Sequence, residues 1–140
     1  MNPLKNPRCR GVVAVIQEGG KLLVIERSAH VVAPGAFCFP GGGILDGETE
    51  EQALVRELEE ELSVTVDPVK RLWESVTPWQ VELAWWQARL PAGAVVTPNP
   101  AEVAHATWLT PAEMLTFHGL LESNLSFLSA LAAGQFDLDA

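Results

Sequence analysis

Residues 41–64 read GGGILDGETEEQALVRELEEELSV, which is a run of three glycines followed by a segment crowded with glutamates. Seven glutamates lie between Glu48 and Glu61, and Arg56 is the one basic residue among them. Thr49 is a good helix N-cap, and Gln52 three residues later completes a capping box. The sequence therefore predicts a strongly acidic helix directly behind a glycine-rich turn.

Two stripes follow this helix when its residues are placed at helical spacing. One is apolar and the other is acidic, and their members are Leu54, Val55, Leu58 and Leu62 in the first and Glu57, Glu60 and Glu61 in the second. A charged stripe is most often a solvated face. Here, however, no lysine is near enough to relieve the like-charge repulsion, and clustered carboxylates are what hard cations such as Mg²⁺ require. The pattern thus favours a divalent-cation site over a merely solvated face.

The glycines preceding the helix fit a ligand-binding role, because backbone without side chains can approach a ligand closely. The common phosphate-binding motifs do not account for them. No G-x-x-x-x-G-K-[ST] sequence occurs, and G-x-G-x-x-G fails because Asp46 stands at the last glycine position.

The spacing of this segment resembles the Nudix box, G-x5-E-x7-R-E-U-x-E-E-x-G-U, where U is aliphatic. Gly42, Glu48 and the run Arg56-Glu57-Leu58-Glu59-Glu60-Glu61 occupy the matching positions. Phe39-Pro40-Gly41-Gly42 resembles the family's lead-in to the box. Ser63 departs from the pattern, since the family has glycine there; a left-handed backbone at Ser63 should cost about 1 kcal/mol without touching the metal ligands.

The resemblance implies an α/β/α sandwich with a mixed central sheet, and the order of local patterns is compatible with that fold. RGVVAVIQEGGKLLVIER predicts a hairpin around Gly19-Gly20. Strands are expected in 64–66, 71–76, 80–90 and 105–109, and helices in 111–117 and 121–133, the first with Thr110 as N-cap and Pro111 at its first position. We expect a single domain over residues 1–140, with 1–9 and 134–140 as flexible ends.

The resemblance also implies which residues carry the chemistry. It makes Glu57, Glu60 and Glu61 ligands of Mg²⁺, with Mn²⁺ as a substitute, Glu48 near them and Arg56 orienting the carboxylates. Which glutamate acts as the general base stays open. Glu102 is similar in placement to an extra carboxylate of MutT-type members and is either a further ligand or base, or a solvated loop residue.

Substrate contacts are expected from residues outside the acidic helix. Gly41 and Gly42 belong to the glycine turn, and Arg27 either touches phosphates, as an arginine does in MutT-like members, or is a surface charge at a strand end. Phe39 and Asn124 are candidates for recognising a base, although Asn124 could equally face solvent.

The five tryptophans are expected mainly in the core. Trp85 and Trp86 must point to opposite faces if they share a strand. Trp79, between two strands, is the tryptophan best placed to stack on a base.

Composition excludes several classes of function. Eighteen acidic and nine basic residues give a net charge of −9, which opposes binding to nucleic acids and anionic membranes. Cys9 and Cys38 form no metal or disulfide motif, and no long apolar or signal-like segment occurs. We therefore expect a cytoplasmic protein that binds a small molecule; its oligomeric state is not readable from the sequence.

Three functions are compatible with these residues. The first is Mg²⁺-dependent hydrolysis of a nucleoside diphosphate linked to another moiety, in particular of an oxidised or ordinary nucleoside triphosphate to monophosphate and pyrophosphate. The second is hydrolysis of ADP-ribose or a dinucleoside polyphosphate. The third is a nucleotide-binding module of the same fold without catalysis, although such modules typically lose box glutamates and none is lost here.

Overall fold

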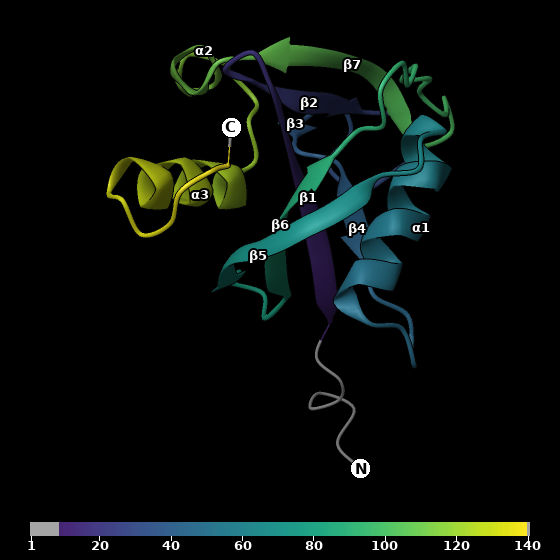
Figure 1. Ribbon diagram of the computed structural model, residues 1–140, viewed down its shortest axis with the longest axis horizontal. Helices are drawn as coiled ribbons and strands as arrows, with labels where there is room; N and C mark the ends of the chain where they lie inside the picture. The colour runs from purple at the N-terminus through teal and green to yellow at the C-terminus, as the bar shows by residue number, and fades with distance from the viewer. Residues whose placement is uncertain (1–8, 140) are drawn as a thin grey trace.

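The computed structural model describes residues 9–139, so the predicted flexible start of the chain lies almost wholly outside the described residues. The chain is a mixed α/β structure in which helix α1 follows the first four strands and helices α2 and α3 follow the last three (Figure 1). The strands are β1 (Arg10–Glu18), β2 (Lys21–Arg27), β3 (Phe37–Cys38), β4 (Gly41–Gly43), β5 (Asp67–Val76), β6 (Glu82–Arg89) and β7 (Val103–Leu109), and the helices are α1 (Glu50–Leu62), α2 (Pro111–Leu115) and α3 (Glu122–Ala132).

Strand β1 is the centre of a seven-stranded mixed sheet, as expected. It runs parallel to β6 and antiparallel to β2 and β4. The hairpin partners β1 and β2 pair only next to their turn, at Gln17 with Leu22 and Glu18 with Lys21. Beyond that point β2 pairs with β3 and β7, whereas β1 pairs with β6 and β4. The sheet therefore splits, and the glycine run enters the split as strand β4.

Helices cover the two faces of the sheet, which confirms the predicted three-layer arrangement. Helix α1 lies on one side and α3 on the other in Figure 1. One core cluster joins the sheet to α1 through Leu54, Leu58 and Leu62, and a second contains Met114 of α2 and Phe127 of α3. Trp85 is buried in the second cluster and Trp86 packs against the first, so these neighbours do point to opposite faces.

One local prediction was wrong. The segment Val64–Val66 was expected to be a strand, but β5 starts only at Asp67, where its pairing with Arg89 begins; Val64 and Val66 are buried as irregular chain. The tail after α3, which the sequence predicts as a flexible end, has several contacts with the body among its described residues. Phe136 packs against Phe127, and the backbone of Asp139 exchanges two hydrogen bonds of 2.8 Å with the side chain of Gln87.

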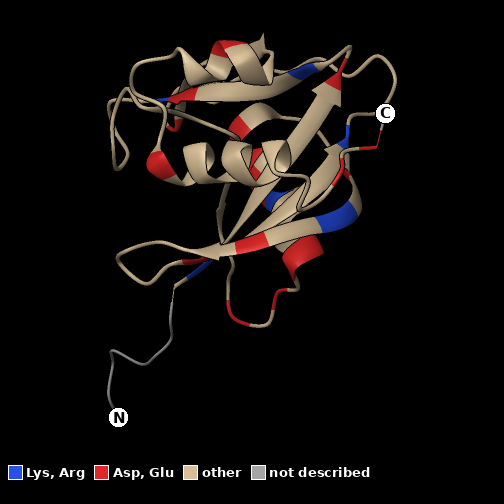
Figure 2. Ribbon diagram, turned by 90° about the vertical axis from the view of Figure 1, so that its left-hand side faces the viewer, with Lys and Arg blue, Asp and Glu red and all other residues tan. Residues whose placement is uncertain are grey.

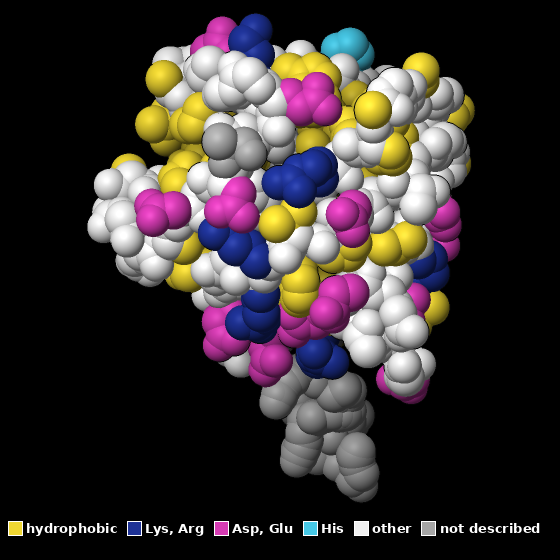
Figure 3. Space-filling view, viewed as in Figure 1, with side chains coloured by type: hydrophobic (Ala, Val, Ile, Leu, Met, Phe, Trp, Pro, Cys, Tyr) yellow, Lys and Arg dark blue, Asp and Glu magenta, His cyan; other side chains and the backbone are white. Residues whose placement is uncertain are grey.

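Charged side chains are distributed differently over helices and strands. Among the basic residues that the structure describes, Arg56 is the one in a helix, and the others lie on strands (Figure 2). Acidic and basic side chains lie next to one another on the face in Figure 3. Two basic residues of β5 form ion pairs: Arg71 pairs with Glu50 and Glu74, and Lys70 pairs with Asp139. Within residues 9–139, no helix is long and apolar enough to cross a bilayer.

Candidate active site

Helix α1 begins as the sequence predicts, with a complete capping box between Thr49 and Gln52. Its apolar stripe packs on the sheet, and this packing carries two neighbouring glutamates inward. Glu57 and Glu61, one turn apart, retain only 9% and 5% of their accessible surface. Carboxylates are rarely buried without a partner, because removing the charge from water is costly.

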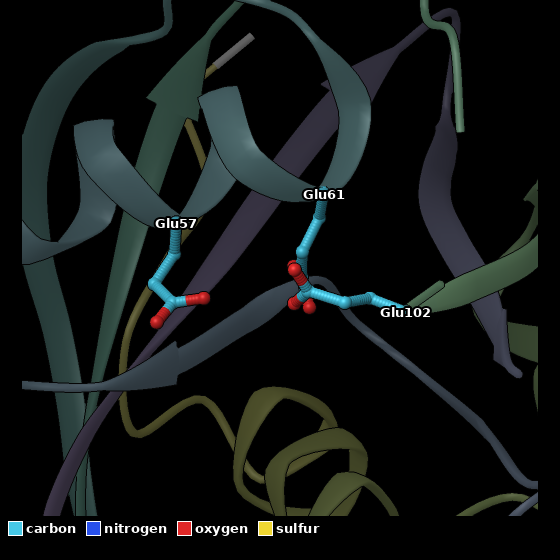
Figure 4. A group of neighbouring side chains, drawn as sticks. All are labelled: Glu57, Glu61 and Glu102. Atoms are coloured by element: carbon cyan, nitrogen blue, oxygen red, sulfur yellow. The ribbon is translucent and has the colours of Figure 1, made fainter. Parts of the chain in front are cut away.

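A third carboxylate joins these two from a distant part of the chain. Oxygen atoms of Glu57, Glu61 and Glu102 lie within 4.8 Å of one another. Figure 4 shows the first two projecting from α1 and Glu102 reaching toward Glu61 from the start of β7. We call these three residues the carboxylate trio.

The three carboxylates of the trio repel one another electrostatically. The pKa of Glu61 is raised to about 8: burial is the main cause, the charges of Glu57 and Glu102 add to the rise, and a hydrogen bond from the Gly41 N–H opposes it. Burial likewise raises the pKa of Glu57, despite the opposing effect of Arg56. Both shifts express the cost of holding several negative charges close together in a poorly solvated place.

The donor set of the trio fits a hard divalent cation. All of its available ligand atoms are carboxylate oxygens, which Mg²⁺ and Mn²⁺ accept, and a cation would relieve the repulsion that raises the two pKa values. The trio supplies fewer ligands than such an ion requires, which leaves positions for water and for substrate phosphates.

The glycines of β4 explain how the trio meets a substrate site. The N–H of Gly41 donates to Glu61 Oε1 at 2.9 Å. A Cβ at Gly41 would collide with the carbonyl of Val12, and a Cβ at Gly42 would collide with the carboxylate of Glu57. Only glycine lets β4 pass between β1 and the acidic face of α1.

Arg56 links several glutamates of this segment. Its Nε and Nη2 donate to the two carboxylate oxygens of Glu48 at 2.6 and 2.9 Å, and its Nη1 donates to Glu57 at 3.0 Å. Its Nη2 also donates to the carbonyl of Gly43 at 2.8 Å. The bidentate pair lowers the pKa of Glu48 to about 2, with help from the N–H of Leu45. Arg56 thus holds α1, Glu57 and the glycine strand in one geometry.

Glu60 stands apart from the trio. Its side chain is 48% exposed, and its Oε1 accepts a hydrogen bond of 3.3 Å from Arg56. The structure therefore brings together Glu57, Glu61 and the loop residue Glu102, whereas the more exposed Glu60 is not part of this group.

An open cavity of about 530 Å³ lies beside β4. All five predicted substrate contacts border it, namely Arg27, Phe39, Gly41, Gly42 and Asn124, and its lining is mainly apolar. Such a size and character are typical of sites for small organic ligands. Gly41 and Gly42 line the cavity and also contact Glu61 and Glu57, so the trio lies next to the cavity across the glycine strand, although none of its three glutamates lines the cavity.

Two of the predicted base-reading groups are engaged elsewhere. The ring of Phe39 is 3% exposed and packs edge-on against Trp85 and Phe127, so it is a core residue and not an open stacking surface. Asn124 is buried, and its Oδ1 accepts from the N–H of Phe39 at 2.9 Å. Its Nδ2 donates to Ser123 Oγ at 3.2 Å, so both the amide oxygen and the amide nitrogen of Asn124 have a partner within the protein.

Other residues of the cavity wall carry polar or aromatic groups. Trp79 borders the cavity with 71% of its surface exposed, as the prediction of a stacking residue requires. Arg27 donates from Nε to the carbonyl of Val32 at 2.5 Å, which ties it to the loop after β2. The sequence did not single out Cys38 or Ser123, although each is next to a predicted residue; burial raises the pKa of the Cys38 thiol to about 11 and keeps it protonated.

A three-layer α/β fold with clustered carboxylates beside an apolar cavity is compatible with a metal-dependent enzyme that acts on a small organic anion. The NUDIX domain family model matches residues 5–131. The chain therefore belongs to the Nudix family, and it is a Nudix hydrolase.

Curated relatives and solved structures agree with this assignment. The chain is 32% identical over 126 residues to the CTP pyrophosphohydrolase of Escherichia coli, covering 87% of this chain and 90% of that protein. It is also 32% identical over 123 residues to a Nudix hydrolase of Deinococcus radiodurans, covering 80% and 69%. Its fold matches the MutT NUDIX hydrolase of Burkholderia pseudomallei with a TM-score of 0.77 at 22% identity, covering 89% of this chain and 98% of that one.

Proposed function

We propose that the protein hydrolyses a nucleoside triphosphate, oxidised or ordinary, to the monophosphate and pyrophosphate in a Mg²⁺-dependent reaction. The observation that carries this proposal is that Gly41 and Gly42 line the 530 Å³ cavity and also contact the carboxylate trio, which places the two next to each other. A nucleoside in the cavity would extend its phosphates past the two glycines toward the trio.

The residues of the chain take distinct roles in this reaction. Glu57, Glu61 and Glu102 would hold the cation, with Glu60 joining them as the family pattern implies, and Arg56 keeps Glu57 and Glu48 in place. When bound, Mg²⁺ neutralises phosphate charge and lowers the pKa of a coordinated water. One glutamate that is not fully engaged as a ligand accepts the proton of the attacking water. Arg27, at the cavity edge, contacts the phosphates.

The relatives differ in the group that is attached to the diphosphate of the substrate. Relatives include a CTP pyrophosphohydrolase, an NAD-capped RNA hydrolase, an RNA pyrophosphohydrolase and an 8-oxo-dGTP diphosphatase. The first of these aligns over 90% of its own length, which favours a free nucleotide. ADP-ribose and dinucleoside polyphosphates are the second candidates, because the same site chemistry would cleave their diphosphate bonds. From the cysteine pattern we predict that the reaction takes place in the cytoplasm.

A substrate panel tests the proposal. Purified protein with Mg²⁺ is given CTP, dGTP, 8-oxo-dGTP, ADP-ribose and a dinucleoside polyphosphate, and kcat/KM and products are measured for each. We expect the highest kcat/KM for a triphosphate, with monophosphate and pyrophosphate as products. A higher value for ADP-ribose or the dinucleoside polyphosphate would transfer the assignment to the second candidates.

A variant on the acidic helix tests whether Glu60 joins the trio in holding the cation, as the family pattern implies. Glu60→Gln should leave the circular dichroism spectrum unchanged and remove nearly all turnover. Glu59→Gln is the matched control, because Glu59 is an exposed neighbour that accepts a hydrogen bond from Thr65 at 3.0 Å. Rates equal to wild type in Glu60→Gln would refute a catalytic role for that residue.

A further inference from the structure

The loop that carries Glu102 is fastened to the end of helix α1. The N–H of Asn99 donates to the carbonyl of Glu61 at 2.8 Å, and its Nδ2 donates to the carbonyl of Glu60 at 3.1 Å. The last carbonyls of a helix have no partner within the helix, so both bonds satisfy groups that would otherwise need water. Asn99, together with the N–H of Thr97, which donates to the carbonyl of Leu62 at 2.9 Å, therefore attaches this loop to the end of α1 that bears Glu61.

The same asparagine shapes the chain on the way to Glu102. Its Oδ1 accepts from the N–H of Ala101 at 3.1 Å, and its carbonyl accepts from the N–H groups of Glu102 and Val103 at 2.9 and 2.7 Å. Pro98 and Pro100 flank it, and prolines restrict both their own backbone and that of the preceding residue. The turn from Asn99 to Val103 is thus stiff and is tied to α1 at one end.

A second fastening joins the loop to the end of β2. The buried Ser28 donates from Oγ to the carbonyl of Ala101 at 2.9 Å, and its N–H donates to the carbonyl of Glu102 at 3.0 Å. Glu102 is therefore fixed between α1 and β2 before any cation binds. Fixing is needed because its carboxylate lies beside two others that repel it.

We propose that Asn99 is a positioning residue that sets Glu102 against Glu57 and Glu61, with Ser28 as its second support. The inference rests on the proposed cation-binding role of the trio. Asn99 acts through Glu102: it prepares the third ligand so that cation binding does not have to order the loop.

A double-mutant cycle on cation affinity tests this coupling. The dissociation constant of Mn²⁺ alone, without nucleotide, is measured by the electron paramagnetic resonance of the free ion. The four proteins are wild type, Asn99→Ala, Glu102→Gln and the double variant. We expect Asn99→Ala to weaken Mn²⁺ binding about tenfold when Glu102 is present and less than about twofold in the Glu102→Gln background.

The controls separate positioning from general destabilisation. Thr65→Ala removes a hydrogen bond to Glu59 on the same helix end and should leave Mn²⁺ affinity unchanged. Urea unfolding in EDTA shows which variants are folded, and if Asn99→Ala is not, Ser28→Ala replaces it in the same cycle. An equal loss of affinity in both backgrounds, or no loss in either, overturns the proposal.

These experiments distinguish a failure of the role proposed for Asn99 from a failure of the proposed function. A wild-type protein that binds no Mn²⁺ would remove the basis of the coupling together with the cation site. A wild-type protein that binds Mn²⁺ with the expected coupling but cleaves no triphosphate would overturn the proposed substrate and leave the role of Asn99 standing.

Discussion

Glu61 combines burial, a backbone hydrogen bond and repulsion from neighbouring carboxylates in one side chain. It is held by a backbone N–H at one oxygen and lies against two further carboxylates, yet it is almost fully buried. Its folded-state pKa of about 8 stands above the ordinary value of 4.5. The folded protein therefore retains a proton that the unfolded chain releases, and Glu61 makes stability fall as the pH rises from 4.5 through 8.

Replacement of Glu61 tests this linkage. In EDTA, the free energy of unfolding of the wild type should decrease between pH 5 and 8, and Glu61→Gln should show a flatter profile because it has no proton to lose. Urea unfolding across that range measures both slopes, with Glu59→Gln as the exposed control. Parallel profiles for Glu61→Gln and wild type would contradict the assigned cause.

Trp79 is a large aromatic residue that stays exposed next to the cavity. Its turn is held by bonds from Thr77 N–H to the Val81 carbonyl at 2.9 Å and from Val81 N–H to Thr77 Oγ1 at 3.0 Å. A fixed turn thus presents a large aromatic ring beside the cavity, where a base would stack on it.

Removing that ring should affect binding more than chemistry. Stacking on a base contributes about 1–3 kcal/mol, so Trp79→Ala should raise KM for the best nucleotide about tenfold and leave kcat nearly unchanged. Steady-state kinetics with Trp79→Phe as the conservative control checks this. An unchanged KM in Trp79→Ala would show that the base lies elsewhere.

At the scale of elements, the end of helix α1 departs from its family pattern in one measurable way. Ser63 adopts a left-handed backbone, with φ 56° and ψ 36°, and its N–H donates to the carbonyl of Glu59. This is the conformation in which the family pattern has glycine, and a residue with a Cβ is strained there. The helix keeps its normal ending, and the strain falls on one residue.

Ser63→Gly should therefore stabilise the protein. Relief of the left-handed strain is expected to add about 1 kcal/mol to the free energy of unfolding, reduced somewhat by the greater freedom of glycine in the unfolded chain. Chemical denaturation measures the difference, and Mn²⁺ affinity should stay the same because the trio is untouched. A lower stability in the variant would show that the serine side chain contributes more than its backbone costs.

At the scale of the whole molecule, two cores on opposite faces of one sheet hold the site in place. The core with α3 contains a stack of aromatic rings, in which Trp85 and Phe127 lie 4.7 Å apart between centroids. Phe136 of the tail extends this stack, with its centroid 4.9 Å from that of Phe127. The tail is thus part of the packing, which explains why a segment that reads as a frayed end contacts the sheet.

Phe136→Ala measures this contribution. Loss of a partly buried aromatic ring should lower the free energy of unfolding by about 2 kcal/mol, whereas Val95→Ala, at a residue that is 74% exposed, should change it little. Urea unfolding of both variants provides the comparison. Equal stability of Phe136→Ala and wild type would show that the tail does not support the core.

Local sequence patterns were enough to predict much of the structure of this protein. Turn residues placed the β1–β2 hairpin, the capping box started α1, and alternation put Trp85 and Trp86 on opposite faces, because each of these depends on neighbours along the chain. The glutamate spacing identified the acidic segment in the same way. Long-range packing settled the rest: Glu102 meets Glu57 and Glu61 while Glu60 stays outside the trio, Phe39 is buried, and the side-chain carbonyl of Asn124 accepts from the N–H of Phe39. These outcomes depend on where the split sheet brings distant loops together, and no periodicity within a single segment encodes that.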